Sequence, residues 1–291
     1  MASSRQETMR PVGGDTKICG IIGYPVAHSL SPRMHAKAYE ALGLNWVYVA
    51  FPVLPEALPS AVKSIRALGI QGMNVTIPYK EAVIPYLDYI DPVAARMGSV
   101  NTIVNSNGQL SGYSTDGDGF ILALDMELGC SVDGRSVFII GAGGSARSIA
   151  FSLAENGVKE IIISNRTRYR ADVLMHDLMV VYPSLSVRVV PDGSPAMFDG
   201  LRSSRIVVNT TPLGMSPNED ATPLTVMDWV TSDHVVCDII YKPFPTQFLK
   251  DASQNGAQIL GGSGMLAGQG ILAFKRFTGY DVDYSVMRRE V

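Results

Sequence analysis

Residues 138–146 read FIIGAGGSA, a short apolar run followed by a glycine-rich turn. Gly141, Gly143 and Ala146 stand in GxGxxA spacing, and the sequence that follows has the period of a helix. In a strand, turn and helix of this kind, the first glycine permits the tight turn, the second lets the backbone approach a pyrophosphate, and the small third residue lets helix and strand pack closely. The stretch therefore predicts a dinucleotide-binding Rossmann unit rather than a merely structural turn. The residues expected to contact the cofactor here are Gly141, Ala142, Gly143, Gly144, Ser145 and Ala146.

The sequence after this turn alternates short apolar runs with longer segments. The apolar runs lie in EIIISNRT, SVRVV, RIVVNTTPLG, HVVCDIIY and AQILGG. Together with FIIG they predict about six strands, the number typical of a dinucleotide-binding sheet. The second half of the chain is therefore expected to form one Rossmann domain.

The end of the next predicted strand indicates which dinucleotide is bound. A carboxylate about 20 residues after the glycines would hold the ribose 2′-hydroxyl of NAD, but this position carries SNRTRYR and no carboxylate. A guanidinium matches a phosphate in charge and geometry, so the segment favours NADP over NAD. The alternative is that these arginines form only a solvated surface. The residues expected to bind the cofactor here are Asn165, Arg166, Thr167 and Arg170.

The N-terminal half shows the same alternation from Lys17 onward. Apolar runs at 17–23, 46–53 and 72–78 predict strands, and runs of helical period follow them at 31–43, 55–69 and 80–90. This order is typical of an α/β unit with a largely parallel sheet. Two extended pieces around Asn105 to Gly108 predict a hairpin, which would make the sheet mixed. Ser31 followed by Pro32 predicts the N-cap and first turn of a helix.

Composition limits the classes of protein and partner. The chain has 291 residues, of which 46% are hydrophobic and 18% charged, with a net charge of -3. This balance predicts a globular protein of two domains and argues against nucleic acid or a membrane as partner. Three distant cysteines lack disulfide or metal-ligand spacing, so we expect no metal site and a cytoplasmic location. The first sixteen residues have the character of a polar leader.

Nine short segments then carry a resemblance to a known family. In order along the chain they are HSLSP, NVTIPYK, VNT, TDG, GAGGSA, NRT, NTTPLGM, the tyrosine of DIIYKP and GMLAGQ. On these segments the chain resembles the shikimate dehydrogenase family, including its quinate/shikimate dehydrogenase branch. The resemblance implies a substrate-binding catalytic domain formed by residues 1–115 and 264–291. It implies that residues 116–263 form an inserted NADP-binding Rossmann domain.

The resemblance also implies roles for individual residues. Lys80 matches the family's catalytic lysine, which would transfer a proton, and Asp116 matches the aspartate beside it. Ser29 and Ser31 match the pair that holds the substrate carboxylate. The other implied substrate contacts are Thr76, Asn101, Tyr241 and Gln269. Along the cofactor the resemblance adds Thr210 on the adenosine side and Ile239 and Gly262 at the nicotinamide.

Four positions carry other expectations. His28 matches a family position without a role, and we expect loop backbone groups to satisfy its ring. Asn74 and Asn101 could each hydrogen-bond to backbone at a turn or strand end in place of a substrate contact. Ser114 stands where many members have asparagine; we expect it to keep a hydrogen bond, although its shorter side chain reaches less far.

The implied reaction is NADP-dependent reversible oxidation of shikimate to 3-dehydroshikimate by hydride transfer. The implied partner is a small hydroxylated ring carboxylic acid, and a homodimer is compatible with the sequence. One alternative is a quinate/shikimate dehydrogenase that uses two substrates or two cofactors. Another is a metabolite sensor that binds both molecules without turnover. Because a sensor has no need of both Lys80 and Asp116, the sequence favours the enzyme.

Overall fold

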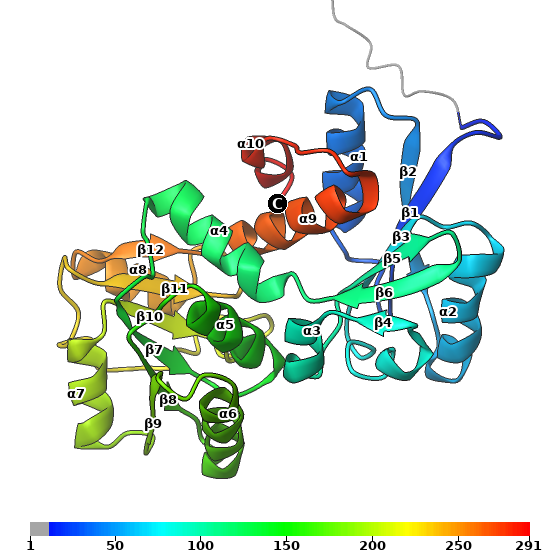
Figure 1. The fold of residues 1–291 in the computed structure, drawn as a ribbon. Helices are drawn as coiled ribbons and strands as arrows, with labels where there is room; N and C mark the ends of the chain where they lie inside the picture. The colour runs from blue at the N-terminus through cyan, green and yellow to red at the C-terminus, as the bar shows by residue number, and fades with distance from the viewer. Residues whose placement is uncertain (1–11) are drawn as a thin grey trace, which may run out of the picture.

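The computed structural model describes residues 12–291 and contains two six-stranded sheets that lie side by side (Figure 1). The expected α/β class is confirmed, with one mixed sheet and one entirely parallel sheet. Residues 1–11 of the expected leader lie outside the described residues.

The first sheet has the strand order β2-β1-β3-β5-β6-β4. Its strands are β1 (Lys17–Gly23), β2 (Trp46–Pro52), β3 (Gly72–Val75), β4 (Tyr89–Ile90), β5 (Thr102–Ser106) and β6 (Gln109–Tyr113). The helices of this part are α1 (Ser31–Ala41), α2 (Leu58–Ala67) and α3 (Pro92–Met97). Apolar residues of α1 pack in the core on one face of the sheet, and those of α2 and α3 pack in a separate core on the other. Both faces are therefore covered, as the near-continuous apolar runs of β1 and β3 require.

The hairpin predicted around Asn105 to Gly108 is confirmed. Strands β5 and β6 pair antiparallel across Asn107 and Gly108, which have φ angles of 54° and 92°. Two consecutive residues with positive φ form the tight turn that matches the twist of paired strands.

The helix predicted over 80–90 is wrong. This segment forms turns, a short 3-10 helix at Ile84–Tyr86 and strand β4. Pro85 lies in the middle of the segment, where it would remove a helical N–H and clash with the carbonyl of Glu81. Lys80 therefore lies in a turn just after β3 and not on a helix.

The second sheet has the order β12-β11-β10-β7-β8-β9, with all of its pairs parallel. Its strands are β7 (Ser136–Ile140), β8 (Glu160–Ser164), β9 (Ser186–Val190), β10 (Ile206–Asn209), β11 (Val235–Asp238) and β12 (Gln258–Leu260). Its helices are α5 (Gly144–Glu155), α6 (Arg168–Val181), α7 (Pro195–Ser203) and α8 (Gln247–Gln254). Each of the six predicted strands is present, and the order is that of a Rossmann sheet.

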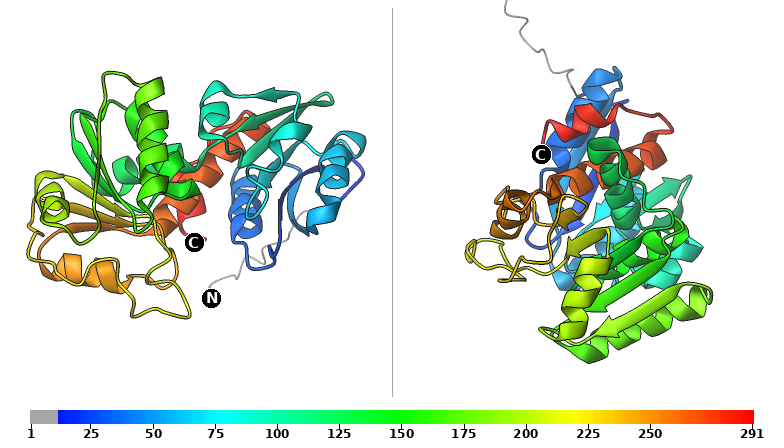
Figure 2. Two further views of the ribbon diagram at one scale, coloured as in Figure 1. Left: turned by 90° about the horizontal axis from the view of Figure 1, so that it is seen from below. Right: turned by 90° about the vertical axis from the view of Figure 1, so that its left-hand side faces the viewer.

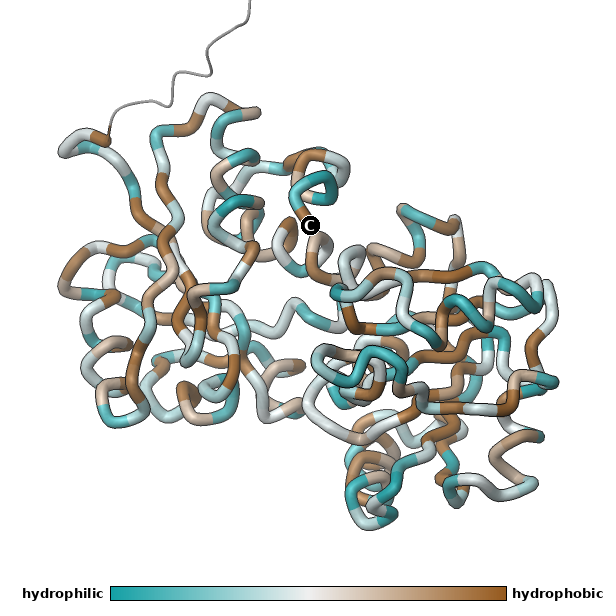
Figure 3. The backbone as a smooth tube through the Cα atoms, turned by 180° about the vertical axis from the view of Figure 1, so that it is seen from behind, coloured by the Kyte–Doolittle hydropathy of each residue, from teal (hydrophilic) through white to brown (hydrophobic). Residues whose placement is uncertain are grey.

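Strand β7 shows why its sequence is apolar throughout. Val137 and Ile139 join the core on one face of the sheet, whereas Phe138 and Ile140 join the core on the other. Successive side chains of a strand point to opposite faces, so a strand covered by helices on both faces needs apolar residues at every position. The hydrophobic stretches along the central strands of both sheets are visible in Figure 3.

Helices α4 (Asp116–Leu128) and α9 (Gly262–Thr278) pack against each other between the two sheets (Figure 2). Their backbones approach closely at Gly119 and Gly268. A Cβ on Gly268 would lie only 2.3 Å from the carbonyl oxygen of Gly119, so a larger residue would not fit there. Asp116 is the first residue of helix α4 and occupies its first turn. The positive end of the helix dipole favours a carboxylate at that position. The final helix is α10 (Tyr284–Arg288), which packs against α1 and α9.

Candidate active site

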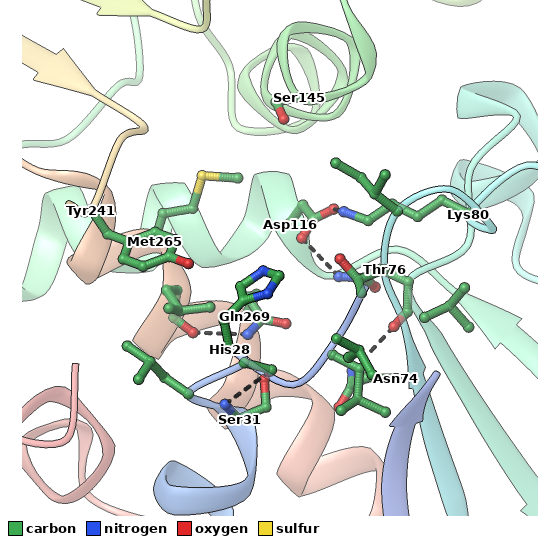
Figure 4. A pocket seen from close by; sticks show the side chains of 18 of the residues that line it. His28, Ser31, Asn74, Thr76, Lys80, Asp116, Ser145, Tyr241, Met265 and Gln269 are labelled. Carbon is green, nitrogen blue, oxygen red and sulfur yellow. Dashed lines mark hydrogen bonds and ion pairs between the residues drawn. The ribbon is translucent and has the colours of Figure 1, made fainter. Parts of the chain in front are cut away.

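A cavity of about 350 Å³ lies between the two sheets, near the carboxyl ends of β1 and β3 (Figure 4). All eight residues predicted to act on or bind the substrate line it. They are Ser29, Ser31, Thr76, Lys80, Asn101, Asp116, Tyr241 and Gln269. Ser145, Ile239 and Gly262, expected at the cofactor, line the same cavity. Residues separated by up to 240 positions are thus brought to one site.

Lys80 and Asp116 form an ion pair at one wall of the cavity. The lysine Nζ lies 2.6 Å from Asp116 Oδ2, with the side chains 29% and 13% exposed. Asn101 Nδ2 donates a hydrogen bond to the other carboxylate oxygen, Oδ1, at 2.9 Å. Figure 4 shows Ser145 of α5 pointing toward the pair from the opposite side of the cavity. The amine is therefore partly buried at the cavity wall, with Asp116 as its partner.

Ser29 and Ser31 lie at the opposite end of the cavity, Ser29 in the loop before α1 and Ser31 at the first residue of that helix. The Ser29 Oγ accepts a hydrogen bond from the Ser31 backbone N–H at 3.3 Å. The predicted N-cap role of Ser31 is wrong, because the helix begins at Ser31 and Leu30 precedes it without a side-chain cap. Ser29 takes over part of that role, and the Ser31 side chain lies in the first turn. Hydroxyl donors beside a helix N-terminus suit a carboxylate.

The remaining predicted contacts take different positions around the cavity. Gln269 Nε2 donates to the Leu266 carbonyl at 2.9 Å, which leaves its amide oxygen as an acceptor. Asn101 Oδ1 accepts a hydrogen bond from the Thr115 backbone N–H at 2.9 Å. The backbone hydrogen bond predicted for Asn101 is therefore present, and the same side chain also contacts Asp116 and lines the cavity. Tyr241 is exposed at the rim.

Two expectations about polar groups are not met. His28 is exposed, its ring points into the cavity (Figure 4), and no hydrogen bond to it from residues 12–291 is present. The loop backbone therefore does not satisfy this ring. The buried hydroxyl oxygen of Ser114 also has no hydrogen-bond partner in the described part of the chain, so the shorter side chain loses the contact altogether.

The sequence analysis missed Met265 and Tyr24, which also line the cavity. Met265 lies four residues before Gln269 on α9, and residues four apart share a helix face. That spacing in GMLAGQ was a usable signal. No sequence signal indicated Tyr24, because its position at the cavity depends on the path of the loop after β1.

The glycine turn fits a dinucleotide. Gly141 has a φ of 112°, and a Cβ there would lie 2.3 Å from Thr210 Oγ1, so only glycine is accommodated. Cβ atoms on Gly143 and Gly144 would meet nothing within 4 Å, which leaves the N-terminus of α5 open to a phosphate. Ala146 is fully buried and packs in the core, as its predicted role in helix packing requires.

A second cavity of about 410 Å³ continues from this turn past the end of β8. It is lined by the predicted residues Gly141, Ala142, Gly143, Asn165, Arg166, Thr167, Arg170 and Thr210. Within residues 12–291, Arg166 and Arg170 have no carboxylate partner, whereas Arg168 between them pairs with Asp172 at 3.4 Å. Two unpaired guanidinium groups at a cavity are suited to a phosphate.

Asp238 lies at the end of β11, next to Ile239 at the cavity. Its carboxylate is 2% exposed and accepts hydrogen bonds from the Ile240 N–H at 3.1 Å and the Thr246 hydroxyl at 2.8 Å. Burial raises the pKa of Asp238 from 3.8 to about 6, an effect that these hydrogen bonds only partly offset. The group therefore stabilises the folded state most when it is protonated.

Stability should depend on pH through this residue. Because the folded pKa lies above the unfolded one, the stabilisation is present below about pH 4 and is lost as the pH rises through about 6. We expect the free energy of unfolding of the wild type, relative to Asp238→Asn, to fall by roughly 2–3 kcal/mol between about pH 4 and pH 7. Urea unfolding at several pH values measures this. Asp125→Asn, at an exposed position of α4, is the control, and a pH-independent difference for Asp238→Asn would refute the expectation.

Two further findings concern ligands and membranes. In the described residues there is no group of three or more His, Cys, Asp or Glu side chains placed to hold a metal ion. No helix of residues 12–291 is long and apolar enough to cross a membrane.

A parallel sheet with a glycine turn, next to a cavity that holds a lysine–aspartate pair and is closed by a second α/β sheet, is the arrangement of a dinucleotide-dependent oxidoreductase. Family models agree along the chain. Residues 21–103 match the shikimate dehydrogenase substrate binding domain, residues 124–211 match shikimate / quinate 5-dehydrogenase, and residues 262–291 match the shikimate 5'-dehydrogenase C-terminal domain. The chain belongs to the shikimate dehydrogenase family.

Individual relatives show the same extent of similarity. The shikimate dehydrogenase (NADP(+)) of Desulforamulus reducens is 43% identical over 277 residues, covering 95% of each chain. The structure of shikimate 5-dehydrogenase from Listeria monocytogenes, in complex with shikimate and NAD, is 35% identical with a TM-score of 0.92, covering 97% of this chain and 98% of that one. The Thermus thermophilus enzyme in complex with NADP(H) and shikimate is 37% identical with a TM-score of 0.84, covering 94% and 98%.

Proposed function

We propose that this protein is an NADP-dependent shikimate dehydrogenase that reversibly oxidises one ring hydroxyl of shikimate to the ketone of 3-dehydroshikimate. The observation that carries the proposal is the Lys80–Asp116 ion pair of 2.6 Å in a cavity that also contains Ser31 and Ser145. One cavity is thus lined by a pair that can transfer a proton, by a hydroxyl that can bind an anion and by a residue of the dinucleotide turn. Names of relatives at about 43% identity support the same substrate and cofactor.

The cofactor, when bound, would accept the hydride from the ring carbon. We assign its phosphates to the N–H groups of Gly143 and Gly144, its 2′-phosphate to Arg166 and Arg170, and its nicotinamide to Ile239 and Gly262. The support for these assignments is the open α5 N-terminus and the placement of the residues along the two cavities.

Loss of hydride from a carbinol requires loss of the hydroxyl proton as well, and the acceptor must be within hydrogen-bond reach. In our proposal the uncharged form of the Lys80 amine accepts that proton, and the ammonium so formed pairs with Asp116, which orients it. The hydrogen bond from Asn101 holds the carboxylate in place. Ser29 and Ser31 bind the substrate carboxylate at the far end, which sets the distance of the reacting carbon from Lys80.

We also propose which parts of the chain form each of the two domains. Residues 1–115 and 264–291 form the substrate domain, and residues 116–263 form the dinucleotide domain. The support is that each part contains its own sheet. A cytoplasmic location belongs to the same proposal, since Cys19, Cys130 and Cys237 are all free.

One panel of assays tests the function. Rates are measured with shikimate and quinate, each with NADP and NAD, by absorbance at 340 nm. We expect the highest kcat/KM for shikimate with NADP. A higher value with quinate would instead support the dual or quinate-preferring alternative, and binding of both molecules without any absorbance change would support the sensor.

The serine pair gives a second test. Ser31→Ala removes one hydrogen bond to a charged carboxylate, which is worth about 1.5–3 kcal/mol, so we expect KM for shikimate to rise about 10- to 100-fold. The value of kcat should change by less than about threefold, because this contact is present before and during the reaction. Ser60→Ala, on the exposed face of α2, is the control. An unchanged KM would exclude the assigned carboxylate contact.

A further inference from the structure

A line of buried hydrogen bonds connects Tyr48, on β2, to the catalytic pair. The Tyr48 hydroxyl donates to Asn74 Oδ1 at 2.7 Å, and Asn74 Nδ2 donates to Thr102 Oγ1 at 3.1 Å. Thr102 donates to Asn101 Oδ1 at 2.9 Å, and Asn101 Nδ2 donates to Asp116 Oδ1 at 2.9 Å. We call these five residues the Tyr48–Asp116 network.

The direction of each hydrogen bond is fixed. Asn74 Nδ2 also donates to the Asn101 carbonyl at 3.1 Å, so its amide oxygen must face Tyr48, and Tyr48 must be the donor. Asn101 Oδ1 accepts from the Thr115 N–H, so its amide nitrogen must face Asp116. A backbone group thus fixes each amide orientation, and the line ends with an N–H aimed at the carboxylate.

The surroundings of Tyr48 keep its hydroxyl protonated. Burial raises the pKa of Tyr48 well above its ordinary value, and the nearby Ser31 hydroxyl opposes this only in part. His35 stacks on the ring at 4.2 Å, and burial lowers the pKa of His35 to about 3, so it brings no charge at neutral pH. A tyrosine that always carries its proton can always donate to Asn74.

We infer that Tyr48 is a positioning residue for the reaction: through Asn74, Thr102 and Asn101 it fixes the hydrogen bond that holds Asp116 against Lys80. The inference rests on the proposed function of that pair. Without the Tyr48 hydroxyl, the buried Asn74 oxygen loses its donor, and an unpaired buried acceptor is costly. The Asn74 side chain would therefore shift, which would lengthen its hydrogen bond to Thr102 and disturb the links that follow.

The test combines Tyr48→Phe with Thr102→Val, which removes the middle link and does not touch Ser31. We expect each variant to lower kcat for shikimate about 10-fold, with KM for NADP within about twofold of the wild type. Because both changes break one network, the double variant should lose about 10- to 20-fold and not the product of about 100-fold. If each substitution only disturbed packing at its own separate place, the two decreases in kcat would instead multiply.

Tyr39→Phe is the matched control. Tyr39 is also buried in the aromatic cluster around His35, but its hydroxyl makes no hydrogen bond to any member of the network. It should leave kcat unchanged. Full activity of Tyr48→Phe, multiplicative losses in the double variant, or an equal loss in Tyr39→Phe would each overturn the inference.

Crystal structures of wild type and Tyr48→Phe, grown under one condition, give a readout independent of turnover. We expect a shifted Asn74 side chain and a lengthened Asn101–Asp116 contact in the variant. If the wild type does not oxidise shikimate, the proposed function fails while these structures still decide the network. An unmoved Asn74 and an unchanged Asn101–Asp116 contact would overturn the inference whatever the activity.

Discussion

Replacement of Lys80 by alanine should lower kcat for shikimate oxidation by about 10²- to 10⁴-fold, the range that a positioned proton-transfer group contributes. Lys80 lies 2.6 Å from Asp116 at the cavity wall. Alanine leaves the substrate hydroxyl without this acceptor, and it also leaves the half-buried carboxylate without its countercharge. Steady-state rates with shikimate and NADP at saturation measure the effect.

Binding of the cofactor should survive this change, because the glycine turn and the arginines of the second cavity remain. We expect the Kd for NADP, measured by fluorescence titration, to stay within about threefold of the wild type. Lys63→Ala, at an exposed position of α2, is the control and should retain full kcat. If Lys80→Ala keeps more than about a third of the wild-type kcat, the lysine is not the proton-transfer group.

The family resemblance supplied most of the residues of this site, and the ends of the strands give a physical reason why several of them lie together. The carboxyl ends of parallel strands meet at one edge of a sheet, so the polar residues that follow β1 and β3 lie close together. The glycine turn after β7 followed from local requirements on backbone angle and contact, and it is present as predicted. Pairing of Lys80 with Asp116 came from the family resemblance, since nothing local to either residue specifies the other.

What the sequence did not reveal depends on packing between elements distant along the chain. The segment around Pro85 has the apolar period of a helix, yet the proline prevents one, and the apolar side chains instead cover the first sheet. The role of Tyr48 was invisible, because an alternating strand gives no sign that one buried hydroxyl meets Asn74 on another strand. Met265 could have been found by helix spacing alone.

Arg166→Asp should change the choice of cofactor. The Arg166 guanidinium lines the second cavity without a carboxylate partner in residues 12–291, so it is free to bind the 2′-phosphate of NADP. Removal of one charge-assisted hydrogen-bonding group costs about 1.5–3 kcal/mol, and the new carboxylate adds repulsion. We therefore expect KM for NADP to rise about 100-fold or more, with a smaller change in kcat.

The response to NAD should be opposite, because NAD has a bare ribose at this position and a carboxylate can accept a hydrogen bond from its 2′-hydroxyl. We expect KM for NAD to stay within about threefold of the wild type or to fall. Arg168→Asp is the matched control: it lies two residues away, introduces the same charge change, and replaces an arginine that pairs with Asp172 and does not line the cavity. An equal rise in KM for NADP in both variants would mean that only the overall positive charge of this loop affects NADP binding. An unchanged KM for NADP in Arg166→Asp would place the 2′-phosphate elsewhere, with Arg170 as the next residue to replace.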